Sequence, residues 1–142
     1  MSPRHATSPD EQAERDRIAG LMKRPEAVFV FGSNHAGRHG KGAAKEAEAK
    51  YGAKRGIGEG LAGRSYGLPT KDARLKTLTL DEVRQHVERF IAFAGARQDL
   101  VFAVTRVGCG LAGFSDAQIA PLFADAPNNC ELPPLWLKLL GR

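Results

Sequence analysis

Two short apolar runs in this chain each end in a glycine-rich turn, and a helix is expected after each turn. Ala27 to Phe31 leads into the turn from Gly32 to Gly42, and Leu100 to Thr105 leads into Gly108-Cys-Gly-Leu-Ala-Gly-Phe114. Strands that alternate with helices at crossover length favour an open sheet flanked by helices. The sequence therefore predicts an α/β fold with a largely parallel or mixed sheet.

Two residue pairs have the spacing of a capping box, in which a residue three positions into a helix bonds back to the residue before the helix. Thr79 with Glu82 predicts the start of a helix with one apolar face, and Ser115 with Gln118 predicts the start of another. Small residues at helical spacing predict a further helix over 43–51. Helices are thus expected after both glycine-rich turns and between them.

Three other segments are expected to have less regular or shorter elements. Four glycines between residues 54 and 64 predict an irregular loop. Ser65 to Asp72 predicts a short strand, which places Lys71 at the end of a strand. The prolines near the carboxyl terminus predict that Leu135-Trp136-Leu137 forms an edge strand or a docked extended segment, with Trp136 as a core anchor.

The chain of 142 residues is long enough for one domain, which we place at 25–142. Residues 1–24 are polar with nearly balanced charges, so we expect a flexible leader with at most a short helix between Glu11 and Met22. No apolar run of about 18 residues and no signal pattern occur, so we expect a cytoplasmic protein without a membrane partner.

Metal and thiol chemistry are not indicated by the sequence. Cys109 and Cys130 are too few for a disulfide framework and lack metal-ligand spacing, so we expect reduced, structural thiols. His35 and His39 flank the first glycine turn without a third ligand nearby, which favours ligand-facing or surface imidazoles over a zinc site. No metal and no cofactor are predicted.

Positive charge is concentrated after the first glycine turn. Between Arg38 and Lys76 there are ten Lys or Arg and four Asp or Glu, a net +6 within a chain of formal net charge +5. Such a cluster favours anionic ligands, although a solvated lysine face is the alternative. The basic residues are not interleaved with aromatic residues, which makes long nucleic acid a less natural partner.

Three loops are expected to meet beyond the carboxyl ends of the strands, where open α/β sheets bind ligands. They are 32–42, 69–72 and 108–114. A glycine turn that opens a helix presents backbone N–H groups to phosphate, and the helix dipole favours the negative charge. The alternative is three unrelated turns that need glycine only for their backbone conformation.

These residues resemble the ligand loops of a known family. Asn34 followed by Gly40-x-Gly42-Ala43-Ala44 resembles the first ligand loop of macro domains, and Gly108 to Phe114 resembles their second, diphosphate-holding loop. Gly-Cys-Gly-Leu together with the pair Thr70-Lys71 is most similar to terminal ADP-ribose glycohydrolases, DNA ADP-ribose glycohydrolase antitoxins and small phage or bacterial macro-like proteins. The resemblance covers about residues 27–123 and implies a three-layer α/β/α fold that binds ADP-ribose.

The resemblance also implies roles for individual residues. Asn34 would bond to the distal ribose, Phe114 would pack on a sugar or base, and Lys71 would act at the anomeric carbon. That catalytic role requires a lowered lysine pKa, for which Arg64, Arg74 and Lys76 are the expected neighbours. The expected ligand-binding residues are Ser33, Asn34, Gly40, Gly42, Ala43, Thr70, Gly108, Cys109, Gly110, Leu111, Ala112, Gly113 and Phe114.

One departure from the family leaves the function open. Ala112 stands where terminal glycohydrolases have an aspartate that helps complete turnover, and neither Asp72 nor Asp116 occupies that position. We therefore expect a glycohydrolase that removes ADP-ribose from a modified target through Lys71, or a non-catalytic module that senses or sequesters ADP-ribose or another NAD-derived nucleotide. A phosphatase acting on an ADP-ribose phosphate is a poorer third alternative. The expected partner is ADP-ribose or an ADP-ribosylated macromolecule, with nucleic acid only as a modified substrate.

Overall fold

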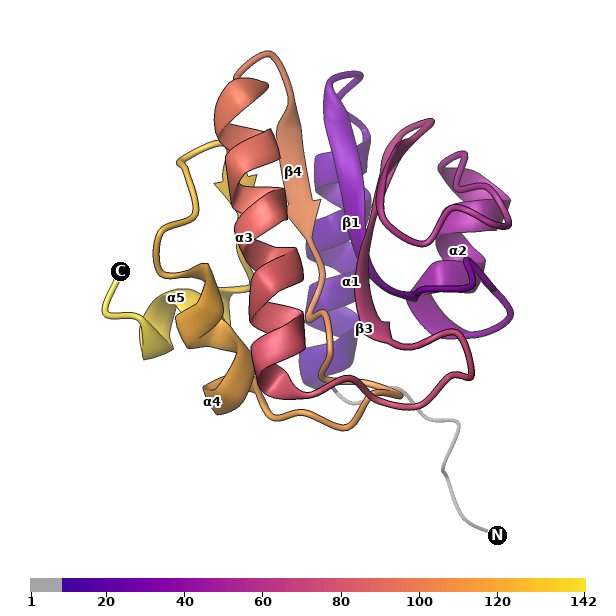
Figure 1. Cartoon of the computed structure of the whole chain (residues 1–142). Helices are drawn as coiled ribbons and strands as arrows, with labels where there is room; N and C mark the ends of the chain where they lie inside the picture. Colours follow the sequence, from indigo (N-terminus) through magenta and orange to yellow (C-terminus); the bar gives the residue numbers. More distant parts are fainter. Residues whose placement is uncertain (1–8) are drawn as a thin grey trace, which may run out of the picture.

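The computed structural model of this protein describes residues 9–142, which form a five-stranded mixed sheet between helices (Figure 1). The strands lie in the order β2-β3-β1-β4-β5. Their bounds are β1 Ala27–Asn34, β2 Gly60–Ala62, β3 Ser65–Lys71, β4 Val101–Val104 and β5 Cys130–Glu131. β1 pairs in parallel with β3 and β4, β5 is parallel to β4, and β2 is antiparallel to β3. The predicted α/β fold with a mixed sheet is confirmed.

Helices cover both faces of the sheet. They are α1 Pro9–Met22, α2 Gly42–Lys50, α3 Leu80–Ala96, α4 Asp116–Ile119, the 3₁₀ helix η1 Ala120–Phe123 and α5 Pro134–Leu139. In Figure 1, α3, α4 and α5 lie in front of the strands and α1 lies behind them. The expected three layers are therefore present.

Successive side chains of β1 point to opposite faces of the sheet, where each face has its own hydrophobic core. Val28 and Val30 pack with α3 and α5 in the larger core, whereas Phe29 and Phe31 pack with α1 and α2 in the smaller one. All four side chains are at most 3% exposed. Because both faces are covered, β1 is apolar in nearly every position, as expected for a central parallel strand.

Both predicted capping boxes are formed. The Thr79 hydroxyl accepts a hydrogen bond from the Glu82 amide at 3.1 Å, and the Glu82 carboxylate accepts one from the Thr79 amide at 2.9 Å. Ser115 and Gln118 make the same pair of bonds at 3.2 and 2.9 Å. These bonds satisfy amides that lack an intrahelical partner, which fixes where α3 and α4 begin.

The short helix allowed between Glu11 and Met22 is present as α1. The segment is not a flexible leader, because this helix packs on the sheet. Ile18 and Met22 are 7% and 5% exposed and belong to the smaller core. Arg17 donates hydrogen bonds to the carbonyls of Val104 and Glu131, at 2.6 and 3.2 Å, so the helix is tied to the ends of β4 and β5. The part of the predicted leader before Pro9 lies outside the described residues.

The loop and tail predictions also need correction. The glycine-rich segment after Lys54 contains the short strand β2, because Gly60 to Ala62 pair with β3. The tail forms the helix α5 in place of an extended segment, because Pro134 occupies the first helical turn, where its missing N–H costs nothing. Trp136 is fully buried, so its expected role as a core anchor is confirmed.

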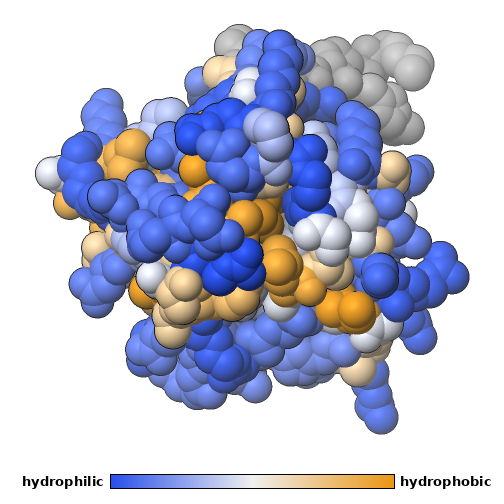
Figure 2. Space-filling model, turned by 90° about the horizontal axis from the view of Figure 1, so that it is seen from above, coloured by the Kyte–Doolittle hydropathy of each residue, from blue (hydrophilic) through white to orange (hydrophobic). Residues whose placement is uncertain are grey.

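The surface opposite the carboxyl ends of the parallel strands is mainly hydrophilic. Figure 2 looks onto the end of the sheet where β1, β3 and β4 begin, and hydrophobic residues there gather near the middle of the face. Among residues 9–142, no helix combines the length and apolarity that crossing a membrane requires.

Candidate functional site

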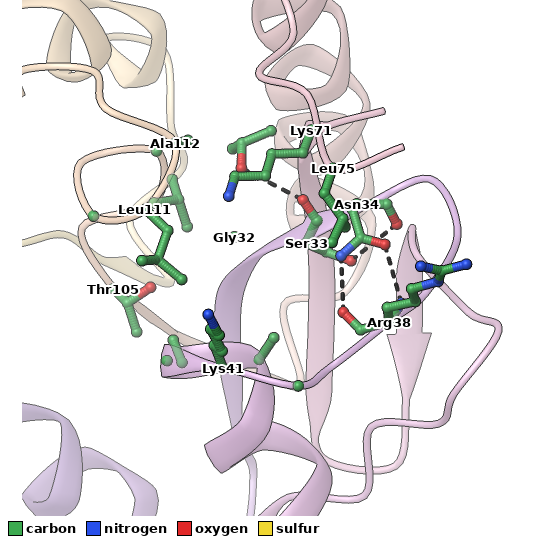
Figure 3. Close-up of a pocket in the computed structure, with 18 of the residues that line it drawn as sticks. Gly32, Ser33, Asn34, Arg38, Lys41, Lys71, Leu75, Thr105, Leu111 and Ala112 are labelled. Atoms are coloured by element: carbon green, nitrogen blue, oxygen red, sulfur yellow. Dashed lines mark hydrogen bonds between the residues drawn. The ribbon is translucent and has the colours of Figure 1, made fainter. Parts of the chain in front are cut away.

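A cleft of about 560 Å³ lies at the carboxyl ends of β1, β3 and β4 (Figure 3). This volume lies within the range of small-molecule sites. The lining residues come from the end of β1 and the start of α2, from the end of β3, and from the loop after β4. They are Gly32, Ser33, Asn34, Arg38, Gly40, Lys41, Gly42, Ala43, Ala44, Thr70, Lys71, Leu75, Thr105, Arg106, Val107, Gly108, Gly110, Leu111 and Ala112.

The topology explains why the cleft forms at the end of β1. The chain leaves β1 toward α2, on the face that carries Phe29 and Phe31, whereas it leaves β4 toward α4, on the opposite face. Two neighbouring parallel strands whose connections diverge to opposite faces leave a crevice between those connections. The three loops expected to meet do contribute to one cleft.

The amino terminus of α2 offers unpaired backbone donors to the cleft. Lys41 is the residue before the helix and makes no side-chain cap hydrogen bond, and no acidic residue lies in the first turn. Gly42 to Ala44, which form that turn, line the cleft. Gly42 has φ of 60°, which glycine adopts without strain. Helix N–H groups and the dipole at this end favour an anion.

Two lysine side chains add positive charge to the cleft. Figure 3 shows the amino groups of Lys41 and Lys71 directed into it from different sides. Neither forms an ion pair with a carboxylate of residues 9–142. The guanidinium group of Arg38 points away from the cleft in the same view. No carboxylate is present among the described residues that line the cleft, so its charge is positive.

Asn34 shapes the loop from which α2 begins. Its side-chain oxygen accepts a hydrogen bond from the Arg38 amide at 3.0 Å, and its side-chain nitrogen donates to the Arg38 carbonyl at 2.8 Å. A primary amide has a second lone pair and a second N–H, so a further bond to a ligand is chemically available. The side chain is only 7% exposed, so its first role is to hold the turn.

Hydrogen bonds fix the loop after β3. The Asp72 carboxylate accepts hydrogen bonds from the backbone amides of Lys76 and Arg74, at 3.0 and 2.8 Å. These bonds lower the Asp72 pKa, and the bond from Lys76 has the largest effect. Thr77 donates from its hydroxyl to the Ala112 carbonyl at 2.9 Å, which joins this loop to the loop after β4. The Asp72 carboxylate therefore serves to hold its own turn.

Arg106 is held at the cleft by a partly buried network of hydrogen bonds. Its guanidinium group donates two hydrogen bonds to the Asp116 carboxylate, one of them at 2.9 Å. The indole N–H of Trp136 donates to the same carboxylate at 2.7 Å. These contacts lower the Asp116 pKa, the bond from Arg106 most strongly. Asp116 does not line the cleft and is already paired, so it does not replace the missing aspartate at Ala112.

The Asp116 pKa predicts how stability depends on pH. A carboxylate with a folded-state pKa below its ordinary value of 3.8 stabilises the fold above that value and loses the contribution as pH falls through the lowered pKa. We expect Asp116→Asn to be destabilising at pH 6 and progressively less so toward pH 3. Urea unfolding at several pH values measures this difference, and a gap that stays constant with pH would contradict the assignment.

Three predicted ligand residues do not line the cleft. Cys109 and Phe114 are partly buried against the larger core, and Gly113 lies beside them in the loop. Burial raises the pKa of the Cys109 thiol to about 12, in keeping with a structural cysteine. Gly108 lines the cleft with φ of 78°, and a Cβ there would lie 3.1 Å from Ile119 and 3.3 Å from Phe114. The Phe114 ring therefore supports the loop from behind.

His39 and Arg64 differ from expectation, whereas His35 is a surface imidazole as expected. His39 is buried against the Phe31 ring, and its Nδ1 lies 3.5 Å from the Glu48 carboxylate without hydrogen-bond geometry, so it is neither ligand-facing nor at the surface. His35 is exposed and bonds to His86 at 3.1 Å. Arg64 donates to the carbonyls of Met22 and Arg24, so it does not act as a neighbour of Lys71. Across residues 9–142, no three His, Cys, Asp or Glu side chains are placed to hold a metal ion.

Eight lining residues were not predicted. They are Gly32, Arg38, Lys41, Ala44, Leu75, Thr105, Arg106 and Val107. Most follow directly from the rule that ligands lie beyond strand ends, because they sit in the same turns as the predicted residues. Leu75 is different, since an apolar residue in a polar turn gives no local signal for ligand contact.

Comparisons with protein families, with curated proteins and with solved structures give no significant match.

Proposed function

We propose that this protein binds ADP-ribose, free or attached to a macromolecule, in the cleft at the carboxyl ends of β1, β3 and β4. The observation that carries the proposal is the uncapped amino terminus of α2, which faces the cleft together with Lys41 and Lys71. A diphosphate needs several backbone donors and positive charge in one place, and this end of the cleft offers both.

The nature of the ligand is argued from the two glycine loops. Their similarity to the ligand loops of macro domains favours ADP-ribose over other nucleotides, and a cleft of about 560 Å³ provides room for a ligand with sugar and phosphate groups. Calorimetric titration with ADP-ribose, AMP and NAD tests this. We expect a clear preference for ADP-ribose, and absence of binding at millimolar ADP-ribose would overturn the proposal.

A second candidate function is removal of ADP-ribose from a modified target. It is favoured by Lys71, whose amino group is directed into the cleft from the end of β3. The absence of a carboxylate among the described lining residues, and Ala112 in particular, favours binding without turnover. The two functions share one ligand and differ only in the fate of the glycosidic bond.

The variant Lys71→Ala distinguishes these functions. If the protein is a glycohydrolase, we expect the variant to lose product formation by at least a hundredfold and ADP-ribose affinity by less than tenfold, because the α2 amides still bind the phosphates. The measurement is ADP-ribose release from a modified substrate, followed alongside calorimetry. A variant that retains full turnover would refute the lysine mechanism. A wild-type protein without turnover at any enzyme concentration would favour the non-catalytic binding module.

A further inference from the structure

Leu75 has a backbone conformation that leucine rarely adopts. Its φ of 65° is the only positive φ at a non-glycine position among residues 9–142. The left-handed region is disfavoured for a residue with a Cβ, and such outliers persist where the surrounding structure imposes them. The residue is also 44% exposed, so burial in the core does not explain the leucine.

The loop imposes this conformation and places the side chain at the cleft. The Leu75 amide donates to the Asp72 carbonyl at 3.0 Å, and the Asp72 carboxylate accepts from the two amides that flank Leu75 in the chain. The Thr77 hydroxyl then fixes the end of the loop to the Ala112 carbonyl. Leu75 therefore projects from a hydrogen-bonded turn and lines the cleft.

A second exposed leucine lines the same cleft. Leu111 is 68% exposed, and its Cδ1 would lie 3.8 Å from a Cβ placed on Gly42, so it reaches the amino terminus of α2. Figure 3 shows Leu111 across the cleft from Ser33, between the amino groups of Lys41 and Lys71. Covering the two leucines with an apolar ligand surface is favourable, because it removes their apolar area from water.

We infer that Leu75 and Leu111 determine specificity by contacting an apolar ring face of the bound nucleotide, either a sugar or a base. This inference rests on the proposed function and adds a second recognition element to it. The phosphates are held by the α2 amides and the lysines, and the leucines select ligands that carry a ring beside the phosphates. A ligand without a ring gains nothing from them.

Variants of the two leucines test the inference. Asparagine tolerates a left-handed backbone, so Leu75→Asn removes the apolar contact without adding strain, and its melting temperature should equal or exceed that of the wild type. Leu111→Asn removes the other contact. Leu135→Asn is the matched control, because Leu135 is 45% exposed on α5 and lies outside the cleft.

Calorimetry with pyrophosphate, ribose 5-phosphate, AMP and ADP-ribose gives the readout. We expect each cleft variant to bind ADP-ribose about tenfold more weakly and pyrophosphate within twofold of the wild type, while Leu135→Asn changes neither. A loss that already occurs with ribose 5-phosphate assigns the contact to a sugar, and a loss that first occurs with AMP assigns it to the base.

The failures of the two proposals are distinguishable. If the wild type binds ADP-ribose and both leucine variants bind it equally well, the inference is wrong and the proposed function stands. If pyrophosphate affinity falls as much as ADP-ribose affinity, the leucines act through the loops and the inference is again wrong. If the wild-type protein binds none of the four probes, both the proposed function and the inference are wrong.

Discussion

If the proposed function holds, replacing Ala43 with aspartate is expected to weaken ADP-ribose binding by at least a hundredfold. Ala43 lies in the first turn of α2, which contains no acidic residue, and it lines the cleft. A carboxylate there interacts favourably with the helix dipole, by about 0.3–1 kcal/mol, which offsets part of the packing that Ala43 makes against the smaller core. The same carboxylate repels the phosphates from the donors they need, and we expect at least a hundredfold loss of affinity, or about 2.7 kcal/mol.

The matched control for this experiment is Ala43→Asn, which has nearly the same shape and no charge. We expect it to lose much less affinity than Ala43→Asp when both are titrated with ADP-ribose. Equal losses in the two variants would show that bulk alone matters at this position. Unchanged binding by Ala43→Asp would remove the helix terminus from the site and with it the main support for the proposed function.

Replacing Trp136 with alanine is expected to be the most destabilising of the substitutions considered. The indole is fully buried, its ring centroid lies 4.9 Å from that of Phe123, and its N–H bonds to Asp116. Removing a buried tryptophan leaves a cavity and costs about 3–5 kcal/mol. In a domain of this size the melting temperature should fall by roughly 10 °C. Urea unfolding followed by circular dichroism measures the change in free energy.

Two further variants in α5 separate the stability that comes from the hydrogen bond of Trp136 from the stability that comes from its apolar contacts. Trp136→Phe retains most of the apolar contact and loses the bond to Asp116, so it should cost about 1–2 kcal/mol. Leu135→Ala changes an exposed residue of the same helix and should remain within about 0.5 kcal/mol of the wild type. If Trp136→Ala unfolds at the same urea concentration as the wild type, the tail is not part of the core.

Features set by neighbouring residues were predictable from the sequence. The two capping boxes depend on residues three positions apart, and both are formed. The strand, turn and helix from Ala27 to Lys50 follow from an apolar run, a glycine turn and a small-residue stripe. Each of these sequence signals acts within one helix, strand or turn, so contacts with the rest of the fold did not alter the predicted element.

Features set by contacts between distant segments were not predictable. The first helix exposes mostly polar residues, and it packs on the sheet through the buried side chains of Ile18 and Met22, with Leu21 partly buried beside them. The tail contains Pro133 and Pro134, which read equally well as an extended segment until Trp136 is seen to fill the core. Sequence pattern alone does not separate a docked helix from a docked strand in segments this short.

The candidate site also contains some residues that the sequence predicted and some that it did not. Gly40, Gly42 and Lys71 were expected beyond strand ends, and they line the cleft. Phe114 was expected to face the ligand, but its ring packs behind Gly108 because the loop folds back on Ile119. Whether a residue of a turn faces the cleft or the core depends on packing across the sheet, which the local sequence does not encode.

The bonds that Arg17 makes have a consequence for the order in which this chain folds. The Glu131 carbonyl that it contacts lies 114 residues further along the chain, and the Val104 carbonyl lies 87 residues further. During synthesis the first helix leaves the ribosome long before either partner exists. Contacts of such separation close late, because the loop between them must first be ordered. The two Arg17 bonds are therefore among the last contacts of α1 to form, after Ile18 and Met22 have packed against nearby Phe29 and Phe31.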